Sequence, residues 1–212
     1  MTKVCCLSDT HGLHGEIEVP ECDILLFAGD FSNTGRPNEV KSFLDWFSIQ
    51  PAEHKIFIAG NHDISFQRNP KFKNECIQNY PNIHYLEDSS IEICNLKIYG
   101  SPFSPIFGNW AYMLPRGKEI QEKWSQIPTD TNILITHGPP AGIMDSVSFS
   151  GEHAGCRDLL NRIDQLDNLS LTCFGHIHQN FGQTKVGNTI FANVAIVDDN
   201  YEVVNQPMTI EV

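Results

Sequence analysis

The 212-residue sequence is short of positive charge. Lysine and arginine together number 14, against 26 aspartate and glutamate residues, so the formal net charge at pH 7 is −12. An acidic protein repels polyanions on average, and proteins that bind long DNA or RNA normally carry a basic stripe. Long nucleic acids are therefore not expected as partners, and any anionic ligand must be attracted locally by a site with positive charge of its own.

The sequence also lacks C-x-x-C pairs and long apolar runs. Its seven cysteines are an odd number, and several lie in or beside apolar, strand-like runs, as buried free thiols do: Cys5, Cys6, Cys22, Cys94 and Cys173. This usage indicates a reducing compartment. The N-terminal MTKVCCLSDTHG becomes polar too soon for a signal peptide, and the apolar runs are far shorter than a membrane span. We therefore expect a cytoplasmic protein without a membrane partner.

The sequence shows no fixed repeat, low-complexity tract or linker-like shift in composition. A hydrophobic fraction of 41% and a charged fraction of 19% are ordinary for a globular protein, and the length suits one domain with a full core. We predict a single domain over residues 1–212.

Short apolar runs alternate with helical patterns along the chain. Helices are predicted over residues 37–49, 116–127 and 156–166, and the strand-like runs are KVCCL, DILLFA, KIFIA, IHYLE, IEICNLKIYG, NILIT, LSLTCF and TIFANV. This alternation predicts an α/β fold. The two runs around Asn95 and the closing TIFANV and MTIEV have no helix between or after them, so part of the sheet is expected to be antiparallel or mixed.

Polar side chains that bind metals follow five of the apolar runs. Because loops after the carboxyl ends of strands line the ligand crevice of such sheets, these residues are the candidate ligands. They are Asp9, His11, Asp30, Asn61, His137, His176 and His178. Each motif alone also fits a turn or a capped strand end, but their shared position favours a metal centre. His14, His54, His84 and His153 do not share it and are interpreted as ordinary solvated or packed histidines.

The size of this donor set predicts two metal ions. Seven oxygen and nitrogen donors are too many for one divalent ion that must keep positions open for substrate and water, so two ions sharing a bridging carboxylate fit better. Of the two aspartates, Asp30 is the better candidate for the bridge, because it stands in a tight glycine turn between the other ligand pairs. Imidazole, carboxylate and amide ligands without cysteine suit Mn, Fe, Zn or Co, and we expect Mn to support activity in vitro.

The motifs D-x-H, G-D, G-N-H-D, H and G-H-x-H occur in this order over residues 4 to about 195. The series resembles the calcineurin-like metallophosphoesterase superfamily, and stretches such as KIFIAGNHD, ILITHGPP and GHIHQNFG resemble its small MPPED-type phosphodiesterases. The resemblance implies a four-layer α-β-β-α sandwich with two central mixed sheets and a dinuclear metal site at the strand ends. It assigns one metal to Asp9, His11, Asp30 and His178, and the other to Asp30, Asn61, His137 and His176.

His62 is the motif histidine that the ligand count does not need. Its ring is therefore free to meet phosphate or leaving-group oxygens, with Asp63 predicted to orient and charge the imidazole. The resemblance points to the same catalytic pair, and Asn61 and His62 are also predicted to contact the substrate. The alternative is that His62 merely caps a strand end.

These residues predict hydrolysis of a phosphodiester by in-line attack of a water that the metals activate. Two divalent ions, two aspartates and a bridging hydroxide would leave about one positive charge in the pocket of an otherwise acidic protein. The expected substrates are small diesters, cyclic nucleotides and first of all 2′,3′-cyclic species. A phosphomonoesterase or protein phosphatase, or a binding scaffold with a vestigial metal site, remain as alternatives, and the sequence does not predict the oligomeric state.

Residues 101–117 form the longest stretch without a predicted element, and the stretch is rich in aromatic residues. Phe103 and Phe107 are predicted to pack against the sheet. Trp110 and Tyr112 are predicted to reach the rim of the crevice, where a nucleobase could stack on their rings.

Overall fold

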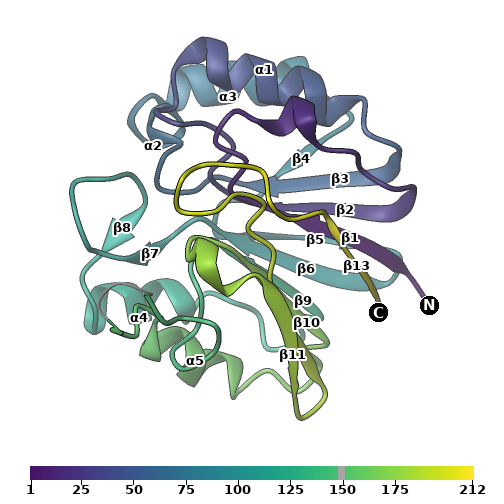
Figure 1. The fold of residues 1–212 in the computed structure, drawn as a ribbon. Helices are drawn as coiled ribbons and strands as arrows, with labels where there is room; N and C mark the ends of the chain where they lie inside the picture. Colours follow the sequence, from purple (N-terminus) through teal and green to yellow (C-terminus); the bar gives the residue numbers. More distant parts are fainter. Residues whose placement is uncertain (148–150) are drawn as a thin grey trace.

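The computed structural model describes residues 1–147 and 151–212, and its strands form two large mixed sheets that face each other (Figure 1). The first sheet has the order β13-β1-β2-β3-β4: Met208–Glu211, Lys3–Leu7, Cys22–Ala28, Ala52–Ile58 and His84–Tyr85. The second has the order β11-β12-β10-β9-β6-β5: Gly182–Val186, Thr189–Asn193, Leu171–Phe174, Ile133–Thr136, Leu96–Ser101 and Ser89–Ile93.

Both sheets have a parallel interior, with one antiparallel edge strand in the first sheet and two in the second. In the first sheet β1, β2, β3 and β4 are parallel and β13 pairs antiparallel with β1. In the second, β12, β10, β9 and β6 are parallel, with β11 and β5 antiparallel at the edges. The predicted mixed topology is confirmed, including the hairpin around Asn95 that joins β5 and β6.

Helices cover the outer face of each sheet. In Figure 1, α1, α2 and α3 lie over the first sheet and α4 and α5 over the second, which gives the predicted four layers. The helices span Pro37–Ser48, Ile64–Arg68, Pro70–Asn79, Lys118–Trp124 and Arg157–Ile163, and short 3₁₀ turns span His14–Glu16 and His178–Asn180. The three predicted helices exist but are shorter than predicted. Among the described residues, no helix has the length and apolar character needed to cross a membrane.

The alternation of side chains along β1 shows how the layers are built. Val4 and Cys6 point between the sheets and join one apolar cluster, while Cys5 and Leu7 join a second cluster on the helix side. Both clusters exclude water almost completely. Burial on both faces explains why the central strands read as continuous apolar runs in the sequence.

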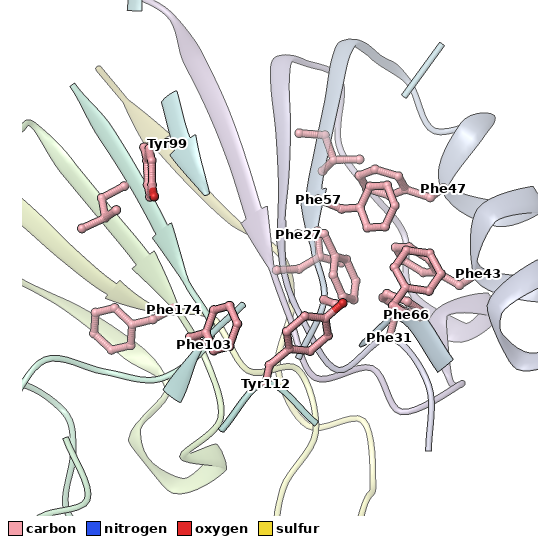
Figure 2. Packing of buried hydrophobic residues seen from close by; sticks show 14 of the residues in the cluster. Phe27, Phe31, Phe43, Phe47, Phe57, Phe66, Tyr99, Phe103, Tyr112 and Phe174 are labelled. Atoms are coloured by element: carbon pink, nitrogen blue, oxygen red, sulfur yellow. The ribbon is translucent and has the colours of Figure 1, made fainter. Parts of the chain in front are cut away.

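Phenylalanine rings fill the space between the first sheet and its helices. Phe43 and Phe47 of α1 contact Phe27 of β2 and Phe57 of β3, with ring centroids 4.7–6.0 Å apart. Figure 2 shows this packing, and shows Tyr112 at the ends of the strands, between the two sheets. The aromatic packing fixes the position of the loops that follow β2 and β3.

The cysteines follow the prediction with one exception. All seven are free, and Cys5, Cys6 and Cys173 are buried while Cys22 is half-buried. Cys94 is exposed, so the prediction that it is buried is wrong. It occupies the turn of the β5–β6 hairpin with a φ of 53°, where the chain reverses at the surface.

Candidate metal centre

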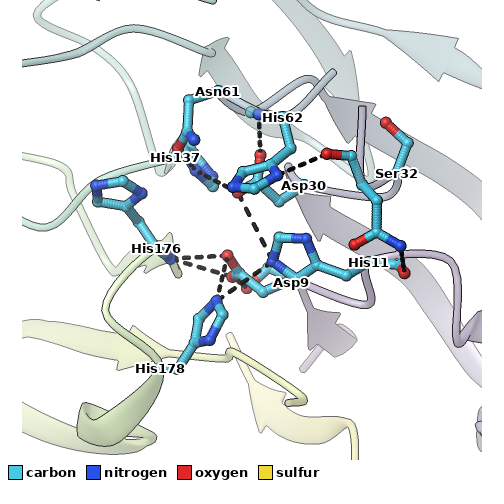
Figure 3. Close-up of polar contacts among 12 residues, drawn as sticks. Asp9, His11, Asp30, Ser32, Asn61, His62, His137, His176 and His178 are labelled. Atoms are coloured by element: carbon cyan, nitrogen blue, oxygen red, sulfur yellow. Dashed lines mark hydrogen bonds and ion pairs between the residues drawn. The ribbon is translucent and has the colours of Figure 1, made fainter. Parts of the chain in front are cut away.

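Loops after five strands bring the seven predicted ligands together at one end of the two sheets (Figure 3). The loop after β1 supplies Asp9 and His11, and the loop after β2 supplies Asp30. The remaining ligands follow β3, β9 and β10: Asn61, His137, His176 and His178. Because these strands run parallel within each sheet, their carboxyl ends meet at the same edge.

Several of these residues adopt a backbone conformation that non-glycine residues rarely take. Asp9, His11, Asp30 and His176 have φ values of 51°, 45°, 57° and 68°. Each such residue costs free energy and persists only where the surrounding structure determines it, which is common at functional sites. The chain is therefore strained where the ligands gather.

Two glycines leave room for the carboxylates. A Cβ added to Gly60 would lie 2.2 Å from Asp30 Oδ1, and one added to Gly175 would lie 1.9 Å from Asp9 Oδ2. Any other residue at these positions would overlap with a carboxylate. The glycines in the G-N-H-D and G-H-x-H motifs are thus required by the close approach of backbone and ligand.

Asp9, His11 and His178 form the first candidate ligand group. His178 Nε2 lies 3.3 Å from His11 Nε2 and 3.5 Å from Asp9 Oδ1. The Nδ1–H of His178 donates to the carbonyl oxygen of Asp198 at 3.1 Å, which leaves the Nε2 lone pair directed toward the group. Burial lowers the pKa of His11 to about 4, so its imidazole is neutral and can act as a ligand.

Asp30, His137 and His176 form the second group, with Asn61 beside them. His137 Nδ1–H donates to the carbonyl oxygen of Ala28 at 3.0 Å. Its Nε2 faces two oxygens, Asn61 Oδ1 at 2.9 Å and Asp30 Oδ2 at 3.2 Å. Burial would lower the pKa of His137, but the Asp30 carboxylate outweighs it and raises the pKa to about 9. The group therefore attracts a positive charge at the point where its donor atoms converge.

The chemistry and arrangement of the donors fit two divalent ions. Asp30 belongs to the second group and also to a third group with His11 and His62, so it lies between the two halves of the site. The Nδ1 of His11 is buried without a hydrogen-bond partner in the described part of the chain. Facing imidazole nitrogens and carboxylates, with no cysteine among them, suit ions that accept mixed nitrogen and oxygen ligands.

His62 is held beside the site by its backbone N–H, by one ring nitrogen and by one face of its ring. Its backbone N–H donates to Asp30 Oδ1 at 2.8 Å. The ring Nδ1 lies 2.8 Å from the carbonyl oxygen of Asn33, and Trp110 stacks on the ring at a centroid distance of 4.3 Å. Because the carbonyl fixes the proton on Nδ1, Nε2 remains available to a substrate.

Asp63 does not orient His62, so that prediction is wrong. Its carboxylate accepts hydrogen bonds from the backbone N–H groups of Asp30, Ser32 and Gly60 and from the Ser32 hydroxyl, at 2.6–3.0 Å. Burial and the Asp30 charge raise the pKa of Asp63, whereas the hydrogen bonds from Ser32 and Gly60 favour its carboxylate form. Asp63 thus ties the loops after β2 and β3 together. The Asn33 carbonyl, rather than Asp63, orients the His62 ring.

A cavity of about 460 Å³ opens in front of the ligands. Trp110 lines it, as predicted, and is 36% exposed. Phe103 is buried, as predicted. Phe107 is 60% exposed, so its predicted burial is wrong, and its ring centroid lies 5.2 Å from that of His176. Tyr112 is fully buried, and the prediction that it reaches the crevice is wrong, because its hydroxyl donates to the half-buried Glu87 instead.

Sequence reasoning did not single out several side chains of the cavity wall, among them Arg116 and Tyr201. Arg116 comes from the end of residues 101–117, the aromatic loop, and Tyr201 comes from the segment between β12 and β13. Neither belongs to a motif. For Tyr201 the DDNY sequence, which is typical of a tight turn, was the available signal.

Comparison with known proteins agrees with this geometry. Residues 2–180 match the family model of the calcineurin-like phosphoesterases. The human "Metallophosphoesterase domain-containing protein 1" is 38% identical in an alignment covering 99% of this chain and 71% of that protein. A Nostoc protein named "3′,5′-cyclic-nucleotide phosphodiesterase alr5338" is 24% identical over 76% of this chain and 58% of its own length.

The fold also resembles a solved structure of low sequence identity. The protein TT1561 of Thermus thermophilus superposes with a TM-score of 0.64 at 12% identity, covering 91% of this chain and 88% of that one. At this identity the likeness concerns the arrangement of sheets and helices alone.

Proposed function

The chain belongs to the calcineurin-like phosphoesterase family, and within this family we propose that it is a metal-dependent phosphodiesterase of small substrates. The preferred class is cyclic nucleotides, with 2′,3′-cyclic species first. Three features support the proposal: the ligand groups, the free Nε2 of His62, and the composition of the cavity wall.

Each half of the site is assigned one divalent ion. Asp9, His11, Asp30 and His178 would hold the first, and Asp30, Asn61, His137 and His176 the second. When bound, such ions would polarise phosphoryl oxygens and lower the pKa of a coordinated water, so that hydroxide is available at neutral pH. Their charge also draws an anionic substrate into an acidic protein.

His62 is suited to protonate the leaving oxygen. With its Nδ1–H donating to the Asn33 carbonyl, Nε2 is the ring atom that takes up a proton and passes it on. Stacking on Trp110 supports the ring in this orientation. The backbone bond to Asp30 holds His62 close to the centre where the phosphate would lie.

The cavity wall is the observation that carries the preference for a diester. Among its lining residues, all within the described part of the chain, Arg116 is the only lysine or arginine, and Glu152 and Asp199 are acidic. Two nitrogens of Arg116 already donate to the carbonyls of Ala154 and Gly155 at 2.7 Å. A phosphomonoester brings close to two negative charges and a diester one, so this wall disfavours the monoester.

The aromatic rim supports a nucleotide as the organic part. Trp110 and Phe107 are exposed beside the ligands, and aromatic side chains bind a base through stacking worth about 1–3 kcal/mol. A cavity of about 460 Å³ is within the usual range for a small ligand. The printed name of the Nostoc relative adds support for cyclic nucleotides as the substrate class.

A hydrolysis screen tests this proposal. Protein with added Mn²⁺ would be assayed on 2′,3′- and 3′,5′-cyclic nucleotides, bis(4-nitrophenyl) phosphate and 4-nitrophenyl phosphate. We expect the diesters to react faster than the monoester. Faster turnover of the monoester would support a phosphomonoesterase instead, and bound metal without turnover of any substrate would support a binding scaffold.

A further inference from the structure

The segment between β12 and β13 forms a turn that is attached to the metal centre. The Asp198 carboxylate accepts hydrogen bonds from the backbone N–H groups of Asn200 and Glu202 at 2.9 and 3.0 Å. The Asp198 carbonyl accepts from the Tyr201 backbone N–H at 3.0 Å and from the ring of His178 at 3.1 Å. The turn is therefore fixed within itself and to a predicted ligand.

This turn holds Tyr201 in an unusual conformation against the ligands. Its φ is 60°, in the left-handed region that a bulky side chain rarely adopts. Its ring meets His11 edge to face at a centroid distance of 4.7 Å, and His178 at 5.8 Å. A strained residue that contacts two ligand imidazoles indicates a functional constraint.

The Tyr201 side chain remains available to a ligand. It is 44% exposed and lines the cavity. Within residues 1–147 and 151–212, its hydroxyl forms no hydrogen bond. By contrast, the half-buried Tyr80 uses its hydroxyl to bond with Asp45 at 2.5 Å.

Three aromatic rings contact different histidines of the site. Trp110 stacks on His62, Phe107 contacts His176, and Tyr201 contacts His11 and His178. Two of these rings come from the aromatic loop after β6, and only Tyr201 carries a hydroxyl. The apolar rings suit a base, and the phenol suits a polar group of the same substrate.

We propose that Tyr201 is a specificity-determining residue whose hydroxyl hydrogen-bonds a hydroxyl group on the sugar of a nucleotide, which in a 2′,3′-cyclic nucleotide is the 5′-hydroxyl. This inference rests on the proposed function, because it assumes a phosphoester held at the metal centre. It adds that the site recognises the sugar as well as the phosphate and the base. An aryl phosphate, which has no sugar, does not form this bond.

Calorimetric titration tests the inference without turnover. Wild-type, Tyr201→Phe and Tyr80→Phe proteins, each loaded with Mn²⁺, would be titrated with adenosine 3′-monophosphate, a product of 2′,3′-cyclic nucleotide hydrolysis that the site must hold, and with phenyl phosphate. Both probes are monoesters, so the acidic wall weakens both alike and their difference reports the nucleoside. Tyr201→Phe should raise the Kd of the nucleotide about threefold to tenfold, the usual effect of one lost hydrogen bond, and leave the Kd of phenyl phosphate unchanged. Tyr80→Phe loses the same atom outside the cavity and should bind both as the wild type does.

The outcomes separate this inference from the proposed function. Tyr201→Phe protein that binds the nucleotide as tightly as wild type, or that binds both probes equally worse, overturns the role of Tyr201 alone. Wild-type protein that binds neither probe, or phenyl phosphate more tightly than the nucleotide, contradicts the nucleotide phosphodiesterase and the inference together. Thermal unfolding should be the same for Tyr201→Phe and wild type, since the hydroxyl has no partner in the described fold.

Discussion

Substitution of Gly60 by alanine should damage the metal centre while leaving the fold intact. The new Cβ would lie 2.2 Å from Asp30 Oδ1 and 2.7 Å from His137 Cε1. To restore a contact of at least 3.0 Å, Asp30 must move by about 0.8 Å. The same oxygen accepts the His62 backbone N–H, so the movement also displaces His62.

The expected cost is larger for function than for stability. Overpacking of this kind typically costs about 1–3 kcal/mol, so the Gly60→Ala protein should fold. A displacement of about 1 Å in a catalytic site can lower turnover about 10²-fold. Because Asp30 lies between the two ligand groups, the bound metal per chain should also fall.

The assay combines metal analysis, turnover of bis(4-nitrophenyl) phosphate and thermal unfolding. Gly15→Ala is the matched control, because nothing lies within 4 Å of its new Cβ and its φ is ordinary. Gly15→Ala should match wild type in metal content and rate. A Gly60→Ala protein with full metal content and wild-type rate would refute the close packing of Gly60, Asp30 and His137 as the basis of the site.

Three further substitutions separate the roles of neighbouring residues. His62→Asn should retain both metals and lose about 10²- to 10⁴-fold in kcat, and loss of metal would instead make His62 a ligand. Asp63→Asn should lower the free energy of unfolding by about 1–3 kcal/mol, since its amide nitrogen would face N–H donors; an unchanged thermal midpoint would contradict this. Trp110→Ala should raise KM for a cyclic nucleotide about tenfold and change KM for bis(4-nitrophenyl) phosphate little, whereas equal changes would show that Trp110 only packs against His62.

The ligands could be predicted because topology alone brings them together. Parallel strands end at a common edge, so Asp9, Asp30 and His137 meet there whatever the details of packing. A local sequence motif at each strand end was sufficient. The partner of the His62 ring could not be predicted in this way, because the Asn33 carbonyl is a backbone group whose position depends on the loop after β2.

The aromatic loop shows the limit of local reasoning. Tyr112 and Trp110 are two residues apart, yet one is fully buried and the other lines the cavity. The difference arises from distant contacts: the Gln67 side chain accepts the Tyr112 backbone N–H at 2.9 Å, and Glu87 binds its hydroxyl. Phe107 turns outward in the same loop. The composition of this loop predicted that it borders the site, but not which of its rings line the cavity.

Two helices also escaped prediction for a physical reason. α2 is only five residues long, and α3 has no fully buried residue, so neither carries a clear apolar stripe. α3 is instead held by an N-terminal cap and by a side-chain ion pair. The Asn69 side chain accepts the Phe72 backbone N–H, and Lys73 pairs with Glu87 at 2.6 Å.

The central claim is that two metal ions carry the activity. Titration with Mn²⁺ of wild-type protein from which a chelator has removed the metal tests this claim most directly. The rate of bis(4-nitrophenyl) phosphate hydrolysis would be followed against bound metal per chain. The two ligand groups that share Asp30 predict no activity without metal and a rate that saturates when two ions are bound. Saturation at one ion, or hydrolysis by the metal-free protein, would contradict a two-metal phosphodiesterase.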